Sequence, residues 1–295
     1  MHLRDQASGE ERIIDAKRSK RLFLLFKYTC NIEGERMNYQ GFLIDLDGTM
    51  YRGRETINEA VKFVQTLQKK GLPYLFVTNN STKRPEAVAE ILQSMQIPAT
   101  AQHVFTTSMA TAAFVSKKSE SARIFSIGEE GLRAALMAEG HQLVDTEADY
   151  VVMGLDREIT YDKLAAAVLQ IRAGAQFIAT NGDVALPTER GLMPGAGSLV
   201  ATVSVSTGIQ PTFIGKPEPI IVEQALEVIG TAKETTLMVG DNYDTDIMAG
   251  LRIGMDTLLV HTGVTTKEQL TKKKEKPTFT VDSLAEWRFD ALERT

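Results

Sequence analysis

Residues 42–49 read Phe-Leu-Ile-Asp-Leu-Asp-Gly-Thr, a short apolar run that ends in two carboxylates. The run 42–44 is continuously apolar and too short for a helix, which predicts a strand buried in a parallel sheet. Asp45 and Asp47 then lie at the carboxyl end of that strand, where open α/β sheets bind their ligands. Residues two apart in an extended segment point the same way, so both carboxylates are expected to face one site.

Two carboxylates that face one another need a cation or a proton, because like charges at close range disfavour each other. Gly48 allows the chain to turn sharply and to approach a ligand closely. An isolated pair of aspartates at this spacing is more often an acidic turn after a core strand. The complete string of apolar residues followed by Asp-Leu-Asp-Gly-Thr favours the ligand site instead.

Strand and helix patterns alternate on both sides of this stretch. Apolar runs that predict strands cover residues 74–77, 124–127, 150–153, 177–180, 211–214, 236–239 and 257–260. Apolar residues recur at helical spacing near residues 57–67, 85–95, 131–139, 161–172 and 217–228. This alternation predicts an α/β protein with a doubly wound parallel sheet.

Two later stretches also place charged groups at strand ends. Residues 215–217 read Gly-Lys-Pro, and Pro217 suits the first turn of the following helix, which predicts that Lys216 lies at a strand-to-helix junction. Residues 240–246 read Gly-Asp-Asn-Tyr-Asp-Thr-Asp after the apolar run 236–239. A lone lysine is usually solvated, and Asp and Thr also cap helices, so neither stretch identifies a site by itself.

Taken in order, residues 42–49, 77–80, 215–217 and 240–246 resemble the four motifs of the haloacid dehalogenase superfamily, and the intervening sequence is most similar to the NagD-type phosphatases. The resemblance covers about residue 38 to the C-terminus. It implies a Rossmann-like core formed by residues 37–107 and 208–295, to which the chain returns at residues 211–214. It also implies a mobile α/β cap domain, residues 108–207, that closes over the site.

The resemblance gives most of the polar residues at these strand ends a role. It implies that Asp45 is a covalent nucleophile and that Asp47 is a general acid and then a general base. Asp45, Asp241 and the backbone carbonyl of Asp47 are the implied ligands of Mg²⁺, a cation that prefers hard oxygen donors. Asp246 is implied as a support for Lys216 or for the metal. The implied substrate-binding residues are Thr78, Asn79, Lys216, Asn242 and Thr245.

Residues 181–197, rich in Gly and Pro, predict a surface loop. In the implied cap domain this loop faces the substrate, which makes Asn181 and Asp183 candidates for specificity contacts.

The implied function is Mg²⁺-dependent hydrolysis of small phosphomonoesters, with sugar or acid-sugar phosphates as the expected class, through an aspartyl-phosphate intermediate. Asp47 argues against two other functional classes of the superfamily. ATPases of this superfamily carry Lys at the position of Asp47, and the dehalogenases that attack carbon lack a general acid there. Two alternatives stay open. A phosphotransferase or phosphomutase keeps both carboxylates, and a sensor without catalytic activity would bind a phosphorylated ligand.

Composition narrows the choice of partners. The chain has 295 residues, a net charge of −5 and 43% hydrophobic residues, which is ordinary for a globular protein with a sizeable core. No basic field favours nucleic acid or an anionic membrane, and no apolar run approaches the ~20 residues that span a bilayer. We therefore expect a small phosphorylated metabolite as partner, no nucleic acid and no membrane, and the resemblance admits a homodimer. The single cysteine, Cys30, excludes an internal disulfide and fits a cytoplasmic protein.

Residues 1–36 do not resemble the start of this domain. The segment is rich in charge, and its short apolar run, residues 22–26, lacks the features of a secretory signal. Residues 33–36 read Glu-Gly-Glu-Arg directly before Met37, and purine-rich codons for them would resemble a ribosome-binding site. We therefore expect residues 1–36 to be a non-native or disordered extension and Met37 to be the natural start.

Overall fold

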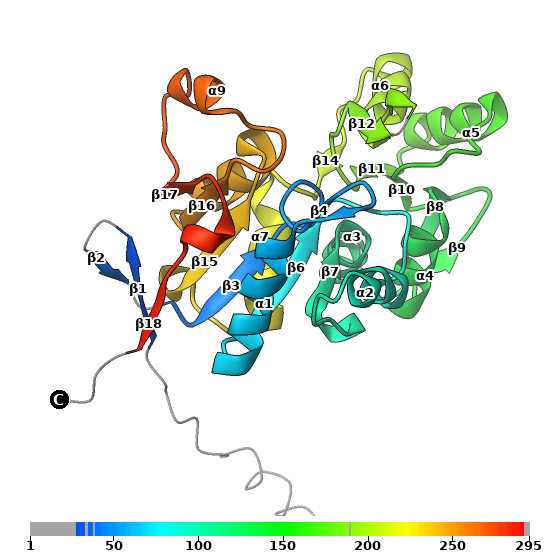
Figure 1. Ribbon diagram of the computed structural model, residues 1–295. Helices are drawn as coiled ribbons and strands as arrows, with labels where there is room; N and C mark the ends of the chain where they lie inside the picture. The colour runs from blue at the N-terminus through cyan, green and yellow to red at the C-terminus, as the bar shows by residue number, and fades with distance from the viewer. Residues whose placement is uncertain (1–27, 33–34, 38, 189, 292–295) are drawn as a thin grey trace, which may run out of the picture.

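The structure, a computed structural model, describes residues 28–32, 35–37, 39–188 and 190–291. Two parallel sheets lie side by side in it (Figure 1). The strands of the larger one, the core sheet, are β3 (Gly41–Ile44), β6 (Tyr74–Thr78), β7 (Val104–Thr106), β15 (Thr236–Gly240), β16 (Asp256–Val260) and β17 (Phe279–Val281). The strands of the smaller one, the cap sheet, are β8 (Arg123–Ile127), β9 (Gln142–Leu143), β10 (Tyr150–Met153), β11 (Gln176–Ala179) and β14 (Thr212–Phe213).

The α-helices connect and cover these strands. They are α1 (Asn58–Lys70), α2 (Pro85–Ser94), α3 (Thr107–Ser116), α4 (Glu130–Ala138), α5 (Tyr161–Arg172), α6 (Ala196–Thr207), α7 (Pro219–Ile229), α8 (Met248–Arg252) and α9 (Lys267–Thr271). Four short helical turns are η1 (Ala101–His103), η2 (Lys233–Thr235), η3 (Tyr243–Ile247) and η4 (Leu284–Glu286). Small antiparallel pairs are formed by β4 (Tyr51–Arg52) with β5 (Glu55–Thr56) and by β12 (Ala185–Thr188) with β13 (Gly191–Pro194).

The strand order of the core sheet is β17-β16-β15-β3-β6-β7, and all of these pairs are parallel. The order of the cap sheet is β14-β11-β10-β8-β9, again parallel throughout. Because helices connect successive parallel strands, the prediction of an α/β protein with a doubly wound parallel sheet is confirmed.

Strand β3 shows why a continuously apolar run is needed at the centre of the core sheet. Successive side chains of a strand point to opposite faces of the sheet. Phe42 and Ile44 enter a hydrophobic cluster with residues of α1 and α2, whereas Leu43 enters a second cluster with residues of α3, α7 and α8. All three side chains are fully buried, as expected for a sheet covered on both faces.

The cap sheet follows the same alternation and is joined to the core by it. Val151 and Met153 of β10 pack with residues of α5 and α6. Their neighbours Tyr150 and Val152 belong to the cluster that contains Leu43 of the core sheet. The two sheets therefore share one continuous hydrophobic cluster.

Strand β14 lies at the edge of the cap sheet, although we expected the chain to return to the core at residues 211–214. Thr212 and Phe213 pair with Ile178 and Ala179 of β11. The helix that follows, α7, begins at Pro219 rather than at Pro217, which we expected in its first turn. The residue ranges of the two domains, 37–107 with 208–295 and 108–207, stay a prediction.

The N-terminal part of the chain is described only in pieces. Of the expected extension, residues 1–27, 33 and 34 lie outside the described residues. Residues 28–32 form β1 (Tyr28–Ile32), and residues 35–36 lie in β2 (Glu35–Met37). Strand β1 pairs with β2 and with β18 (Phe289–Ala291) in a separate antiparallel sheet. Within the described residues, no helix combines the length and the apolar character needed to cross a lipid bilayer.

We expect Leu43→Ala to lower the free energy of unfolding by about 2–5 kcal/mol, because it leaves a cavity in the cluster shared by both sheets. Urea unfolding followed by circular dichroism measures this loss. The matched control is Leu169→Ala on α5, where the side chain is 67% exposed, with an expected change within about 0.5 kcal/mol. Equal stability of the two variants would contradict the central position of Leu43.

Candidate active site

Three aspartates meet at the carboxyl edge of the core sheet. Asp45 directly follows β3 and Asp241 directly follows the neighbouring strand β15, while Asp246 lies in η3 on the chain after β15. Each of the three offers a carboxylate oxygen, and these atoms all lie within 4.8 Å of one another. The structure therefore brings together two of the predicted metal ligands and the predicted supporting residue.

Lys216 is the cation at the centre of this cluster and is 1% exposed. Its Nζ lies 2.5 Å from Asp45 Oδ1 and 2.7 Å from Asp246 Oδ1, and it donates a hydrogen bond of 2.8 Å to the carbonyl oxygen of Val77. Burial alone would lower the pKa of Lys216, but the charges of Asp246 and Asp45 outweigh burial and raise this pKa above its ordinary value. Lys216 is therefore an ammonium ion at neutral pH.

Asp246 has both carboxylate oxygens engaged. Oδ1 contacts Lys216 and accepts a hydrogen bond of 3.3 Å from the Thr245 hydroxyl, and Oδ2 accepts one of 3.1 Å from the backbone N–H of Asn242. Gly240 packs against this carboxylate, and a Cβ atom at that position would collide with it. The arrangement fits the supporting role predicted for Asp246.

The Asp241 carboxylate is fixed by groups from two loops. Oδ1 accepts a hydrogen bond of 3.1 Å from the Thr49 hydroxyl, and Oδ2 accepts one of 2.7 Å from the backbone N–H of Val264. Gly48 and Gly263 lie so close to the carboxylate that a Cβ atom at either position would overlap it. Burial and the charge of Asp246 raise the pKa of Asp241 to about 7, although the hydrogen bonds from Val264 and Thr49 oppose this rise.

The donor set fits a hard divalent cation. The carboxylates of Asp45, Asp241 and Asp246 outnumber the single ammonium of Lys216 in a buried place, which leaves an excess of negative charge. Burial, together with the charges of Asp246 and Asp241, also raises the pKa of Asp45 well above its ordinary value, despite the opposing charge of Lys216. Oxygen ligands of this kind suit Mg²⁺.

Asp47, the predicted acid and base, lies at the base of the β4–β5 hairpin. Asp47 is exposed as a whole, but partial burial of its carboxyl raises the pKa of Asp47, and a hydrogen bond from the Gly53 backbone opposes this rise. Tyr51 of β4 lies near both catalytic candidates, since burial and the charges of Asp47 and Asp45 raise the pKa of its phenol. A carboxyl whose pKa is raised is better able to hold the proton that a general acid needs.

Of the remaining predicted residues, Thr78 ends β6, Asn242 lies between β15 and η3, and Thr245 lies in η3. Thr78 Oγ1 accepts a hydrogen bond of 3.1 Å from the backbone N–H of Asn80. Asn242 caps η3 by accepting a hydrogen bond of 3.0 Å from the backbone N–H of Asp244. These contacts orient Thr78 and Asn242 locally, and the substrate-binding roles of Thr78, Asn242 and Thr245 stay predictions.

Asn181 and Asp183, the predicted specificity residues, lie next to Asn79. The Asn181 side-chain amide donates a hydrogen bond of 2.8 Å to the carbonyl oxygen of Asn79. The Asn79 side-chain amide in turn donates to the carboxylate of Asp183, at 3.3 and 3.2 Å, and to the carbonyl oxygen of Lys216 at 2.9 Å. Residues from the end of the cap sheet therefore reach into the site.

Residues 261–265 also build the site, and sequence reasoning gave them no role. Val264 contacts the Asp241 carboxylate, and the backbone N–H of the next residue, Thr265, donates a hydrogen bond of 3.1 Å to the carbonyl oxygen of Asp241. The Thr262 hydroxyl donates a hydrogen bond of 2.7 Å to the carbonyl oxygen of Gly48. His261 Nδ1 lies 2.9 Å from the carbonyl oxygen of Thr265. A signal for these residues is present in the sequence. The apolar run 257–260 predicts a strand that ends directly before residue 261, at the same edge of the core sheet as Asp45 and Asp241.

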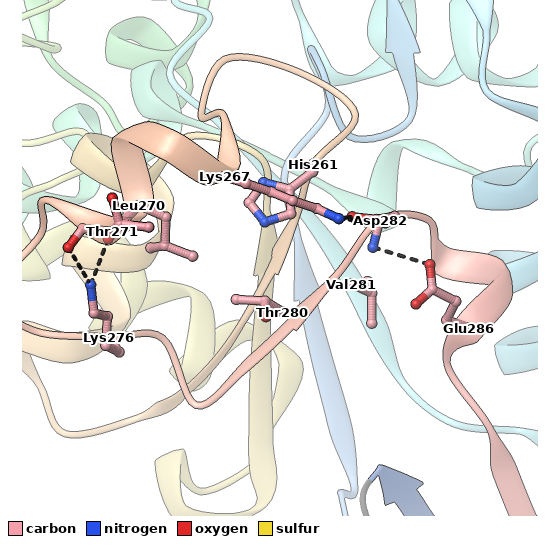
Figure 2. Close-up of a pocket in the computed structure, with 9 residues that line it drawn as sticks. All are labelled: His261, Lys267, Leu270, Thr271, Lys276, Thr280, Val281, Asp282 and Glu286. Carbon is pink, nitrogen blue, oxygen red and sulfur yellow. Dashed lines mark hydrogen bonds and ion pairs between the residues drawn. The ribbon is translucent and has the colours of Figure 1, made fainter.

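A cavity of about 400 Å³ lies beside this loop, lined by residues of β17, of α9 and of the segments around them (Figure 2). His261 lies on its wall. Both of its lysines are engaged: Lys267 forms an ion pair with Asp282, and Lys276 donates to two carbonyl oxygens of α9. The acidic cluster is not part of its lining, so this cavity is separate from the candidate active site.

Comparisons with known proteins identify the family of this chain. Residues 42–142 match the family described as haloacid dehalogenase-like hydrolase, and residues 213–287 match one described as HAD-hydrolase-like. The 5'-nucleotidase YutF of Bacillus subtilis is 60% identical over 249 residues, which are 84% of this chain and 97% of the relative. An acid sugar phosphatase of Staphylococcus saprophyticus is 52% identical over 250 residues, 84% of this chain and 96% of the relative.

The solved structures include similar folds. The crystal structure of a double mutant of a thermostable NPPase from Geobacillus stearothermophilus is similar with a TM-score of 0.81 and 57% sequence identity. The match covers 85% of this chain and 98% of that chain. These similarities confirm the resemblance predicted from the four motifs and the prediction of a hydrolase.

We expect the affinity for Mg²⁺ to fall by up to about tenfold for each pH unit below the Asp241 pKa of about 7. Below this pH the Asp241 carboxyl holds a proton that must leave before the oxygen can bind the ion, whereas above it the carboxylate is already free. Isothermal titration of the metal-free protein with MgCl₂ at pH 8 and pH 6 measures the difference.

Two variants at aspartates that are close in the sequence control this experiment. Asp241→Asn is expected to abolish Mg²⁺ binding at both pH values, and Asp244→Asn, which alters an exposed carboxylate paired with Lys273, is expected to preserve it. Equal Mg²⁺ affinity of the unaltered protein at pH 8 and pH 6 would contradict the role of Asp241.

Proposed function

The chain belongs to the haloacid dehalogenase-like hydrolases, in their NagD- and YutF-like branch, and we propose that it hydrolyses small phosphomonoesters through an aspartyl-phosphate on Asp45. One observation carries the choice of nucleophile. The side chain of Asp45 is 13% exposed, whereas those of its partners Lys216 and Asp246 are 1% and 2% exposed. Asp45 is thus the member of this ion cluster that a substrate can reach.

The main obstacle to this reaction is electrostatic. A phosphomonoester dianion and a carboxylate repel each other by roughly 4 kcal/mol per pair of unit charges at ~4 Å and an effective dielectric constant near 20. Lys216 supplies one fixed positive charge against Asp45. A bound Mg²⁺, held by Asp45, Asp241 and the backbone carbonyl of Asp47, would supply a second and would polarise the phosphoryl group. Pre-placed charge of this kind is commonly the largest catalytic contribution.

The reaction proceeds in two displacements at phosphorus. A carboxylate oxygen of Asp45 forms a bond to phosphorus while the bond from phosphorus to the ester oxygen breaks, and Asp47 gives its proton to the leaving alkoxide. Asp47, now a carboxylate, removes a proton from water as the water oxygen attacks the phosphoenzyme. Phosphate leaves and the Asp45 carboxylate is restored. Thr78 supports binding, because its hydroxyl accepts from Asn80 and can donate its own hydrogen to a phosphoryl oxygen.

The substrate class rests on the relatives. Sugar and acid-sugar phosphates are the proposed class, and the name of the Bacillus subtilis relative adds 5'-nucleotides to the compounds that need comparison. A panel of sugar phosphates, acid-sugar phosphates and 5'-nucleotides, ranked by kcat/KM, identifies the preferred class, since the specificity between two substrates is the ratio of their kcat/KM values. Release of inorganic phosphate, rather than transfer to a second sugar, separates hydrolysis from phosphoryl transfer between metabolites.

We also propose a cytoplasmic location, which rests on the single cysteine, Cys30, and the lack of any disulfide within one chain. A homodimer is the assembly state that the family resemblance favours, and size-exclusion chromatography with light scattering would measure it.

We expect Asp45→Asn to lower kcat by at least about a thousandfold, because an amide keeps the shape of the side chain but lacks the nucleophilic charge. Hydrolysis of 4-nitrophenyl phosphate with Mg²⁺ measures the loss, and circular dichroism verifies the fold. The control Asp282→Asn changes a carboxylate of the separate cavity and is expected to keep full activity. Substantial turnover by Asp45→Asn would overturn the proposal.

We expect Asp47→Asn to accumulate the phosphoenzyme with 4-nitrophenyl phosphate. The 4-nitrophenolate leaving group needs little help from an acid, so the first displacement stays fast, whereas the attack of water loses its base. Rapid-quench kinetics should show a burst of 4-nitrophenol, and mass spectrometry should find the phosphoryl group on the peptide that contains Asp45. A phosphoryl group on any other residue would argue against the intermediate.

A further inference from the structure

The side chain of Asn79 joins the two sheets. A carboxamide has two N–H hydrogens, and both are engaged here. One points to the carbonyl oxygen of Lys216 at 2.9 Å, and the other is shared between the carboxylate oxygens of Asp183 at 3.3 and 3.2 Å. The amide therefore links a carboxylate at the end of the cap sheet to the backbone of the lysine that contacts Asp45.

Lys216 lies three residues after β14, the edge strand of the cap sheet. The pairing of β14 with β11 continues past the strands, because the backbone N–H of Gly215 donates to the carbonyl oxygen of Thr180 at 2.7 Å. The Thr107 hydroxyl donates to the same oxygen at 2.6 Å. Gly215 packs against Asn79 Oδ1, and a Cβ atom would lie only 2.6 Å from that atom. The backbone just before Lys216 is thus held by Thr180, at the end of β11, and by Asn79, which also contacts the Lys216 carbonyl oxygen.

The backbone of Asp183 is itself held firmly. Its N–H donates to Asn181 Oδ1 at 3.1 Å, and its carbonyl oxygen accepts from the N–H of Gly197 at 2.9 Å. Gly195 and Gly197 pack against the backbone of residues 182–183, where a Cβ atom would collide. This Gly-rich stretch, for which the sequence predicts a surface loop, therefore fixes the place from which the Asp183 carboxylate reaches Asn79.

We propose that Asp183 is a positioning residue for Lys216: through the Asn79 amide it fixes the Lys216 carbonyl, and so the distance between the Lys216 ammonium and Asp45. The proposal rests on the proposed function, since it assigns Lys216 a part in phosphoryl transfer. It differs from the role in substrate specificity expected from the sequence. A positioning residue changes kcat similarly for every substrate, whereas a specificity contact changes KM and the ranking of substrates.

Removal of the Asp183 carboxylate tests this role. We expect Asp183→Ala to lower kcat by about 10- to 100-fold, the range associated with a displacement of ~1 Å at a catalytic group, with little change in KM. Asp183→Asn keeps one oxygen that can accept from Asn79, so its kcat should stay within roughly threefold of the unaltered protein. The matched control is Asp162→Ala, which removes an exposed carboxylate from α5.

Opposite outcomes would favour the specificity role. The carboxylate would then act on the substrate directly, and Asp183→Asn would lower KM for a dianionic substrate by removing a repulsive charge. An unchanged kcat in Asp183→Ala, or a change confined to KM, overturns the proposal.

A double-mutant cycle shows whether Asp183 acts through Asn79. In the Asn79→Ala background, Asp183→Ala should cause no further loss of kcat, because the connecting amide is already absent. Losses that multiply would show that the two residues act independently and would overturn the proposal. Urea unfolding of the unaltered protein, the two single variants and the double variant gives the coupling of the two residues in the free energy of unfolding, a readout that does not depend on turnover. Failure of the proposed function is distinguishable, because the unaltered protein would then release no phosphate.

Discussion

One buried ammonium holds the candidate site together. Lys216 contacts Asp45, Asp246 and the carbonyl oxygen of Val77, and these partners come from different segments of the chain. Two buried carboxylates beside each other would be strongly unfavourable without this cation, and removal of one partner from such a buried set is costly, typically ~3–5 kcal/mol, because the others are left uncompensated. The end of β3, strand β6 and η3 are therefore coupled at a single nitrogen atom.

The balance of charge around this nitrogen explains the selectivity expected of the site. Lys216 compensates part of the cluster, and burial raises the pKa of both Asp45 and Asp241. An anionic substrate is unfavourable at such a site unless a further cation accompanies it. The same excess of carboxylates that makes a divalent cation necessary also supplies the hard oxygen atoms that bind it. Metal binding and phosphate binding thus have one electrostatic origin, and each reduces the cost of the other.

Much of this could be predicted because the decisive signals are local. Buried parallel strands are continuous apolar runs, and helices that cover a sheet show apolar residues at helical spacing. Residues 150–153 and 161–172 are therefore predicted with the bounds that β10 and α5 have in the structure. The pairing partner of residues 211–214 could not be predicted, since a short apolar strand is compatible with either sheet and long-range packing decides between them. Pro217 and Pro219 both suit a first helical turn, and only the structure shows that α7 uses the second. The hairpin of β12 and β13 could not be predicted, because the Gly and Pro residues of this stretch are typical of a loop.

The position of β14 bears on the cap closure that the family resemblance implies. If the whole cap sheet rotated as a rigid body and carried Lys216 with it, Lys216 would lose its contacts with Asp45 and Asp246 of the core. Those contacts are buried, so their loss would leave charges unpaired in an apolar surrounding. The hydrophobic cluster shared by both sheets opposes the same rotation. A displacement of the cap sheet that preserves the charged cluster therefore requires either that the chain bend between β14 and Lys216, at residues 214–215, or that the ends of β11 and β14 stay with the core.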